Sequence, residues 1–173
     1  SVKKQTSSGA VSFDETSLLV VSDRLLALQQ ECLVRIYSGE CKLLLVELCC
    51  DDDSSLGSLV LGTCSLLRVS KKIDILASDT QDLLFNLVLA LEHYEIIVHV
   101  WVSIPCTAGC RWRSANAAKG AATGDMDATI DMINVVCKFL QQVVAMSGSF
   151  SWEWPSTSQL WKMVKGFLSS TTM

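Results

Sequence analysis

Short apolar runs alternate with amphipathic segments along most of this chain, and this alternation limits the folds open to it. Residues 42–50 form an apolar run broken only by Lys42 and Glu47, which is typical of a parallel strand covered on both faces, and residues 96–104 form a second apolar run that is rich in β-branched residues. Further strands are expected at 64–69, 72–76 and 149–154, and helices at 14–37, 78–91, 125–146 and 156–168. Capping boxes are expected at the start of two of these helices, formed by Ser78 with Gln81 and by Ser156 with Gln159. The order predicts a doubly wound α/β fold with a mostly parallel sheet, right-handed crossovers and an extra N-terminal helix.

Length and charge narrow the classes of function. The 173 residues, 50% of them hydrophobic, suit a single domain over 14–173, preceded by a polar segment 1–13 that we expect to be flexible. A formal net charge of -4 gives no general attraction to phosphate, so contact with nucleic acid requires a local basic patch.

The cysteines do not form the framework of a small secreted domain. All eight lie scattered through the chain, without a CxxC pair: Cys32, Cys41, Cys49, Cys50, Cys64, Cys106, Cys110 and Cys137. The Cys106–Cys110 spacing has no second half that would complete a zinc site, so we expect no metal. Without an apolar signal segment or a run of about 18 apolar residues, we expect an intracellular protein, cytoplasmic or nuclear, that does not bind a membrane.

The two prolines mark the ends of two predicted strands. Pro105 follows the strand 96–104, and Pro155 follows the strand 149–154. Because proline donates no hydrogen bond to a sheet, the neighbouring side chains pass to loops at the carboxyl edge, where α/β proteins bind ligands. The thiol of Cys106 and the carboxylate of Glu153 are thereby predicted to face one another as nucleophile and proton donor.

The first predicted strand ends in an acidic loop. Three aspartates, Asp51 to Asp53, stand where a nucleotide-binding loop normally has glycines. They would repel a pyrophosphate but could bind hydroxyls or a cationic ligand. A turn that caps a helix explains them equally well.

These motifs together resemble a known family. Glu47 to Gly57, Ile73-Asp74-Ile75, Ile104-Pro105-Cys106-Thr107 and residues 150–155 follow the order and approximate spacing of the catalytic core of cytosine-C5 DNA methyltransferases. The resemblance covers about residues 42–165. It implies the Rossmann-like class I methyltransferase fold, with S-adenosylmethionine as cofactor and a nucleobase or nucleic acid as substrate.

The resemblance assigns roles to individual residues. Cys106 resembles the thiolate that adds to cytosine C6, and Glu153 resembles the acid that protonates or hydrogen-bonds N3. Glu153 lies between Trp152 and Trp154 and could simply alternate in and out on an exposed strand. Partial burial there would instead raise the pKa of its carboxyl and favour the protonated form. The resemblance also implies cofactor contacts at Glu47, Asp51, Gly57 and Asp74, and phosphate contacts at Arg111, Arg113 and Lys119.

Other interpretations of the same residues stay open. Cys106 could be a packing thiol at a strand end, and the tryptophans could simply pack rather than stack on an extruded base. The aspartates in the loop, the sequence Val69-Ser70-Lys71 without an acidic residue, and the lack of a target-recognition domain favour a catalytically inactive module. Such a module would serve binding or assembly within a larger or mobile-element-derived protein, or would need a partner subunit for recognition.

A thiol hydrolase or transferase that uses Cys106 as its nucleophile is the third hypothesis. It needs a base beside the thiol, but His99 lies within the predicted strand and His93 at its far end.

Overall fold

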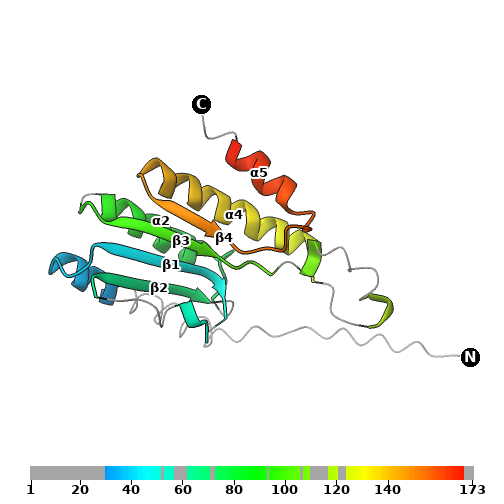
Figure 1. The fold of residues 1–173 in the computed structure, drawn as a ribbon, viewed down its shortest axis with the longest axis horizontal. Coiled ribbons are helices and arrows are strands. Elements are labelled where there is room, and N and C mark those ends of the chain that lie inside the picture. The colour runs from blue at the N-terminus through cyan, green and yellow to red at the C-terminus, as the bar shows by residue number, and fades with distance from the viewer. Residues whose placement is uncertain are drawn as a thin grey trace, which may run out of the picture.

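The computed structural model describes residues 30–51, 53–56, 62–70, 73–92, 94–105, 107–109, 117–120 and 124–169. Within these ranges four parallel strands form one sheet in the order β2-β1-β3-β4 (Figure 1). The strands are β1 (Leu43–Cys50), β2 (Cys64–Ser70), β3 (Ile97–Val102) and β4 (Ser149–Trp152). The helices are residues 30–37, α2 (Ser78–Glu92), α4 (Met126–Ala145) and α5 (Trp161–Ser169), with a short 3-10 turn η2 (Thr107–Gly109).

The predicted α/β class with a parallel sheet is confirmed, and the strand order is compatible with a Rossmann-like fold. The strands predicted at 42–50, 64–69, 96–104 and 149–154 all appear, each within a few residues of its expected bounds. Of the predicted N-terminal helix 14–37, residues 30–37 are helical. The rest of that helix and the segment 1–13 lie outside the described residues.

One face of the sheet is fully buried. On this face Val46 of β1 lies beside Leu67 of β2 and Val100 of β3, and all three side chains are fully buried. Figure 1 shows α2 and α4 side by side behind the sheet, where they cover this face. The two helices meet through Phe85 and Phe139, whose ring centroids lie 5.7 Å apart in an edge-to-face arrangement.

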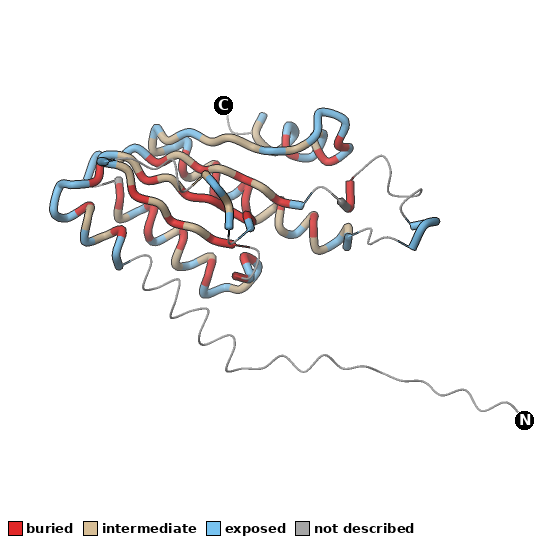
Figure 2. Tube along the Cα trace, turned by 60° about the horizontal axis from the view of Figure 1, so that its bottom comes forward, coloured by how far each residue is buried: buried red, intermediate tan, exposed pale blue. Residues whose placement is uncertain are grey.

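The opposite face is covered unevenly (Figure 2). At the β2 edge, the helix at residues 30–37 buries Cys32 and Ile36, and Arg35 donates to the carbonyl of Cys64 at 3.0 Å. Along β3 and β4 this face is only half-buried, and His99 there contacts the hydroxyls of Ser149 at 2.8 Å and Ser151 at 3.2 Å. Polar side chains therefore occupy the part of the sheet that the described helices leave open.

Two local predictions are wrong. Residues 73–77 form a bend and turn instead of a strand, because the Asp74 carboxylate accepts from the amide of Leu76 at 2.9 Å and fixes a turn. The expected capping box between Ser78 and Gln81 does not form either. The helix already includes Ser78, and the Gln81 side chain donates to the carbonyl of Leu76 at 2.9 Å.

The last helix also begins later than expected. The predicted cap at Ser156 is replaced by Ser158, whose hydroxyl accepts from the amide of Leu160, and α5 starts at Trp161. By contrast, α4 begins as predicted, with the Asp125 carboxylate accepting from the amides of Asp127 and Ala128.

Among the described helices, α4 alone has the length and apolar composition needed to cross a membrane. The same helix carries seven buried residues and packs on the sheet as the central helix of the core. A helix buried in the core of a domain has the same length and apolar composition, so these two properties do not distinguish it from a membrane-spanning helix.

Candidate functional site

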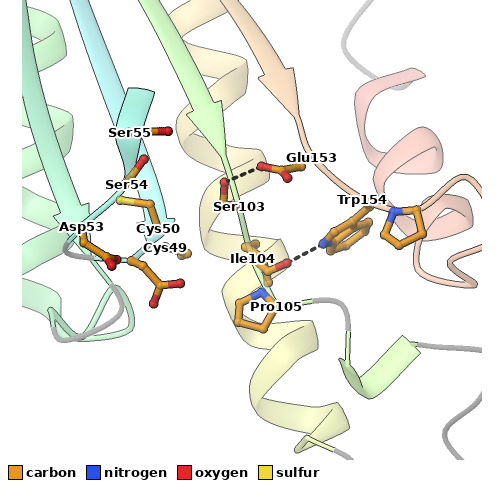
Figure 3. A pocket seen from close by; sticks show the side chains of 12 residues that line it. Cys49, Cys50, Asp53, Ser54, Ser55, Ser103, Ile104, Pro105, Glu153 and Trp154 are labelled. Carbon is orange, nitrogen blue, oxygen red and sulfur yellow. Dashed lines mark hydrogen bonds between the residues drawn. The ribbon is translucent and has the colours of Figure 1, made fainter. Parts of the chain in front are cut away.

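A pocket of about 880 Å³ opens at the carboxyl ends of β1, β3 and β4 (Figure 3). In the sheet, β2 lies next to β1 toward one edge, whereas β3 and β4 lie toward the opposite edge, so the direction of strand addition reverses between β1 and β3. Ligands of open α/β sheets bind at this kind of reversal, outside the carboxyl ends of the strands. The pocket therefore lies where the fold itself predicts a ligand.

Side chains from both sides of this reversal line the pocket. The β1 side contributes Cys49, Cys50, Asp51, Asp53, Ser54 and Ser55, and the β3 and β4 side contributes Ser103, Ile104, Pro105, Glu153, Trp154 and Pro155. Carboxylates, hydroxyls, two thiols and one indole are thus present, and none of these twelve residues is basic.

The wall at the end of β1 is built on an irregular backbone. Cys49 has a φ of 60°, in the left-handed region, and the register between β1 and β2 shifts between Leu48 and Cys50. This bulge turns the chain away from the sheet and into the acidic loop. Burial raises the pKa of the Cys49 thiol to about 12 and that of Cys50 to about 11, so both thiols are protonated at neutral pH.

A buried ion pair supports the same loop from below. The Glu47 side chain is 1% exposed, and its Oε2 accepts from Nε of Arg68, the facing residue on β2, at 2.8 Å. Its Oε1 accepts from the Ser54 hydroxyl at 2.6 Å, and Arg68 also donates to the Ser54 carbonyl at 2.9 Å. Both carboxylate oxygens of Glu47 are therefore bonded within the protein, and Glu47 does not line the pocket.

On the other wall, Glu153 follows β4 and points toward β3 (Figure 3). Its Oε2 accepts from the Ser103 hydroxyl at 3.3 Å and from Nε1 of Trp101 at 3.4 Å. The backbone amide of Glu153 donates to the Val102 carbonyl at 2.9 Å, which extends the pairing of β3 and β4 by one residue. Glu153 is exposed, which agrees with the alternative of an exposed strand end and not with partial burial between the tryptophans.

Trp154 holds its position in the pocket through an aromatic cluster. Its Nε1 donates to the Ile104 carbonyl, and its ring lies edge-on to Trp152 and to Trp161, with centroids 4.9 Å and 5.4 Å apart. The alternation of a strand therefore sends Glu153 and the two tryptophans to different neighbours.

The structure brings together some of the residues that the sequence singled out. Asp51 and Glu153 line the pocket, and so does Pro105, which directly precedes Cys106. Asp74 fixes the turn after β2 and does not line the pocket. Lys119 is exposed in the short segment 117–120. Cys106, Gly57, Arg111 and Arg113 lie outside the described residues, so their roles stay predictions.

Sequence reasoning missed several residues of the site. Ser103 stands two residues before the proline that ends the strand, and its hydroxyl was the available signal. Ser54 follows the three aspartates and could have been recognised as a hydrogen-bonding residue at a strand end. The Arg68–Glu47 pair joins residues 21 positions apart and depends on the register of two strands, which no local pattern contains.

Within the described ranges, no three histidine, cysteine or acidic side chains lie close enough together to hold a metal ion. No protein family, curated protein or solved structure matches this chain. The function is therefore inferred from the side chains that line the pocket.

Proposed function

We propose that this chain is a methyltransferase-like domain that binds S-adenosylmethionine and transfers its methyl group to a nucleobase or nucleic acid. One observation carries the proposal: an acidic pocket at the reversal between β1 and β3 is lined by Glu153 on one wall and by Pro105, the residue that precedes Cys106 in the sequence. The resemblance assigns nucleophile and proton donor to Cys106 and Glu153.

The residues of the pocket fit the proposed cofactor. A volume of about 880 Å³ lies within the usual range for small-molecule sites, about 300–1,000 Å³. Asp51, Asp53 and Ser55 can accept hydrogen bonds from ribose hydroxyls and from the amino group of the methionine part. The cofactor has no phosphate. The negative charge of the aspartates, which would repel a pyrophosphate, therefore does not disfavour this cofactor.

The chain's own groups perform the remaining steps of the proposed reaction. The Cys106 thiolate forms a bond to pyrimidine C6, and Glu153 hydrogen-bonds or protonates N3 as electron density moves into the ring. In the described part of the chain Ser103 and Trp101 donate to Oε2 of Glu153, so in the protonated acid Oε1 would carry the proton for N3. The cofactor, when bound, supplies an electrophilic methyl group to C5. Water then takes the proton from C5, Glu153 takes back the proton from N3, and cleavage of the C6–sulfur bond releases the Cys106 thiolate and restores the aromatic ring.

Phosphate contacts of the substrate are proposed for Arg111, Arg113 and Lys119. The exposure of Lys119 supports this assignment, as does the position of all three within fifteen residues of Cys106. A recognition domain or partner subunit would supply sequence preference.

Titration calorimetry with S-adenosylmethionine tests the binding part of the proposal, and saturable heat is the expected result. Catalysis is then followed as transfer of a labelled methyl group to cytosine-containing DNA. Cys106→Ser should abolish transfer and leave cofactor binding unchanged, whereas Cys110→Ser, the matched control, should keep both. The absence of saturable heat at millimolar cofactor would remove the proposal.

The second candidate is a catalytically inactive α/β module for binding or assembly. The acidic loop favours it, since Asp51 and Asp53 line the pocket where the related enzymes have glycines that let the backbone approach the cofactor. The commitment of both Glu47 oxygens to Arg68 and Ser54 points the same way. If Cys106→Ser changes neither folding nor any measurable activity, the inactive module is the better account.

The thiol hydrolase receives no support from the described residues. His99 contacts the hydroxyls of Ser149 and Ser151 on the half-buried face of the sheet and does not line the pocket. An activated Cys106 would still reveal itself by rapid labelling with iodoacetamide at mildly acidic pH.

A further inference from the structure

Among the described residues that line the pocket, every charged side chain is acidic. Asp51 and Asp53 come from the loop after β1, and Glu153 comes from the opposite wall after β4. Asp53 and Glu153 are both exposed, so both carboxylates are available to a ligand that enters from solvent. Carboxylates on two walls of a cavity create a negative potential inside it, which low-dielectric surroundings strengthen.

One basic side chain, Arg68, lies beneath the loop that forms the β1 wall. It is bonded to Glu47, and its guanidinium also donates to the Ser54 carbonyl. Arg68 does not line the pocket, so a ligand in the pocket meets the carboxylates of Asp53 and Glu153 and not the guanidinium.

The uncharged part of the lining also suits a cation. Trp154 presents an indole, the aromatic group that binds cations best, and its position is fixed by the Ile104 carbonyl and by Trp161. Cys49 and Cys50 contribute neutral, polarisable sulfur atoms because burial keeps both thiols protonated.

We propose that this pocket selects the cationic sulfonium of S-adenosylmethionine over the neutral thioether of S-adenosylhomocysteine. The inference rests on the proposed function and goes further, since it assigns the selectivity to Asp53, Glu153 and Trp154. The two molecules differ by one methyl group and one positive charge. A comparison of their affinities therefore isolates the electrostatic contribution of these side chains.

This selectivity has a consequence for turnover. Transfer of the methyl group would leave the sulfur of the ligand neutral, so Asp53, Glu153 and Trp154 would no longer attract it by its charge. The charge lost in the reaction would thus promote release of the spent cofactor.

The test compares three ligands by titration calorimetry on the whole chain. These are S-adenosylmethionine, S-adenosylhomocysteine and an analogue in which a protonated N-methyl amine takes the place of the S-methyl sulfonium. At an ionic strength of about 0.01 M we expect both cationic ligands to bind about tenfold more tightly than the thioether. At about 0.15 M the preference should shrink because salt screens exposed carboxylates.

Two variants assign the effect to the pocket. Asp53→Asn keeps the shape of the side chain and removes its charge, so the preference for cations should fall to about threefold or less at low salt. Asp131→Asn removes an exposed charge from α4, outside the pocket, and should leave the preference unchanged. Circular dichroism of both variants checks that they are folded.

The outcomes separate this inference from the proposed function. Equal or tighter binding of the thioether would overturn the selectivity while the cofactor assignment stands. A preference that survives in Asp53→Asn, or that disappears equally in Asp131→Asn, would also overturn it. If none of the three ligands binds at millimolar concentration, both proposals fail together.

Discussion

The Glu47–Arg68 pair gives the sharpest test of how the pocket loop is supported. Arg68→Met keeps much of the side-chain volume but removes the partner of a carboxylate that is 1% exposed. Breaking one side of a buried ion pair typically costs about 3–5 kcal/mol, because the remaining charge cannot reach water. Against a total stability of about 5–15 kcal/mol for a domain, this loss is large.

The reverse substitution should cost much less. Glu47→Gln removes the carboxylate that is paired with Arg68, but the arginine side chain is 23% exposed and can be hydrated. The glutamine can still accept from the Ser54 hydroxyl, so we expect a loss of about 1–3 kcal/mol. The double variant Glu47→Gln/Arg68→Met carries no buried charge and should therefore be more stable than Arg68→Met alone.

Urea unfolding followed by far-ultraviolet circular dichroism measures all four proteins. The free energies are compared at a common m-value, so that changes in the midpoint report stability. If Arg68→Met lies within about 1 kcal/mol of the parent, or if the double variant is no more stable than Arg68→Met, the pair does not act as argued. Should Arg68→Met fail to fold, rescue of folding in the double variant still tests the same point.

Two further predictions concern packing and pH. A methyl group on Gly148 would lie 2.8 Å from the carbonyl oxygens of Val143 and Val98, so Gly148→Ala should cost about 1–3 kcal/mol in urea unfolding. A methyl group on Gly166 in α5 would meet no atom of the described residues within 4 Å, so Gly166→Ala should raise the free energy of unfolding by about 0.5–1 kcal/mol. A Gly148→Ala protein as stable as this control would contradict the close packing at Gly148. Burial raises the pKa of Cys49 to about 12 and of Cys137 to about 11 from an ordinary 9.0, so above pH 9 the unfolded chain loses these protons first and the free energy of unfolding falls as pH rises towards 11–12. Cys137→Ala should reduce that slope by up to about 1.4 kcal/mol per pH unit, and an unchanged slope would show that the thiol does not contribute.

The sequence predicted the elements whose pattern is local. The strand at Leu43–Cys50 is apolar except for Glu47, and the helix that begins after Asp125 has a repeating buried face, so local sequence patterns located both. Periodicity failed at 73–77, where Ile73 and Ile75 alternate as in a strand but the Asp74 side chain closes a turn. In that segment the hydrogen bond to the Asp74 side chain and the backbone bonds from Ile73 to Ser70 and from Ala77 to Asp74 outweigh the apolar pattern.

The site was only partly predictable, because its geometry comes from register. The carboxylate of Glu153 was found from the proline two residues later, but its contacts with Trp101 and Ser103 cross from β4 to β3, about fifty residues away. The role of Glu47 changed for the same reason. Its partner Arg68 faces it only because β1 and β2 pair in this register, and a chain pattern cannot reveal that a carboxylate after a strand is already neutralised.

The three clustered indoles also give the molecule an optical property. The ring centroids of Trp152 and Trp161 lie 6.4 Å apart, and the Trp154 centroid lies 4.9 Å from that of Trp152 and 5.4 Å from that of Trp161. At such separations excitation energy passes readily among the rings, so quenching of one dims all three. Since Trp154 borders the pocket, a molecule seated there would change the emission of the whole cluster, and occupancy could be followed in unlabelled protein by fluorescence alone.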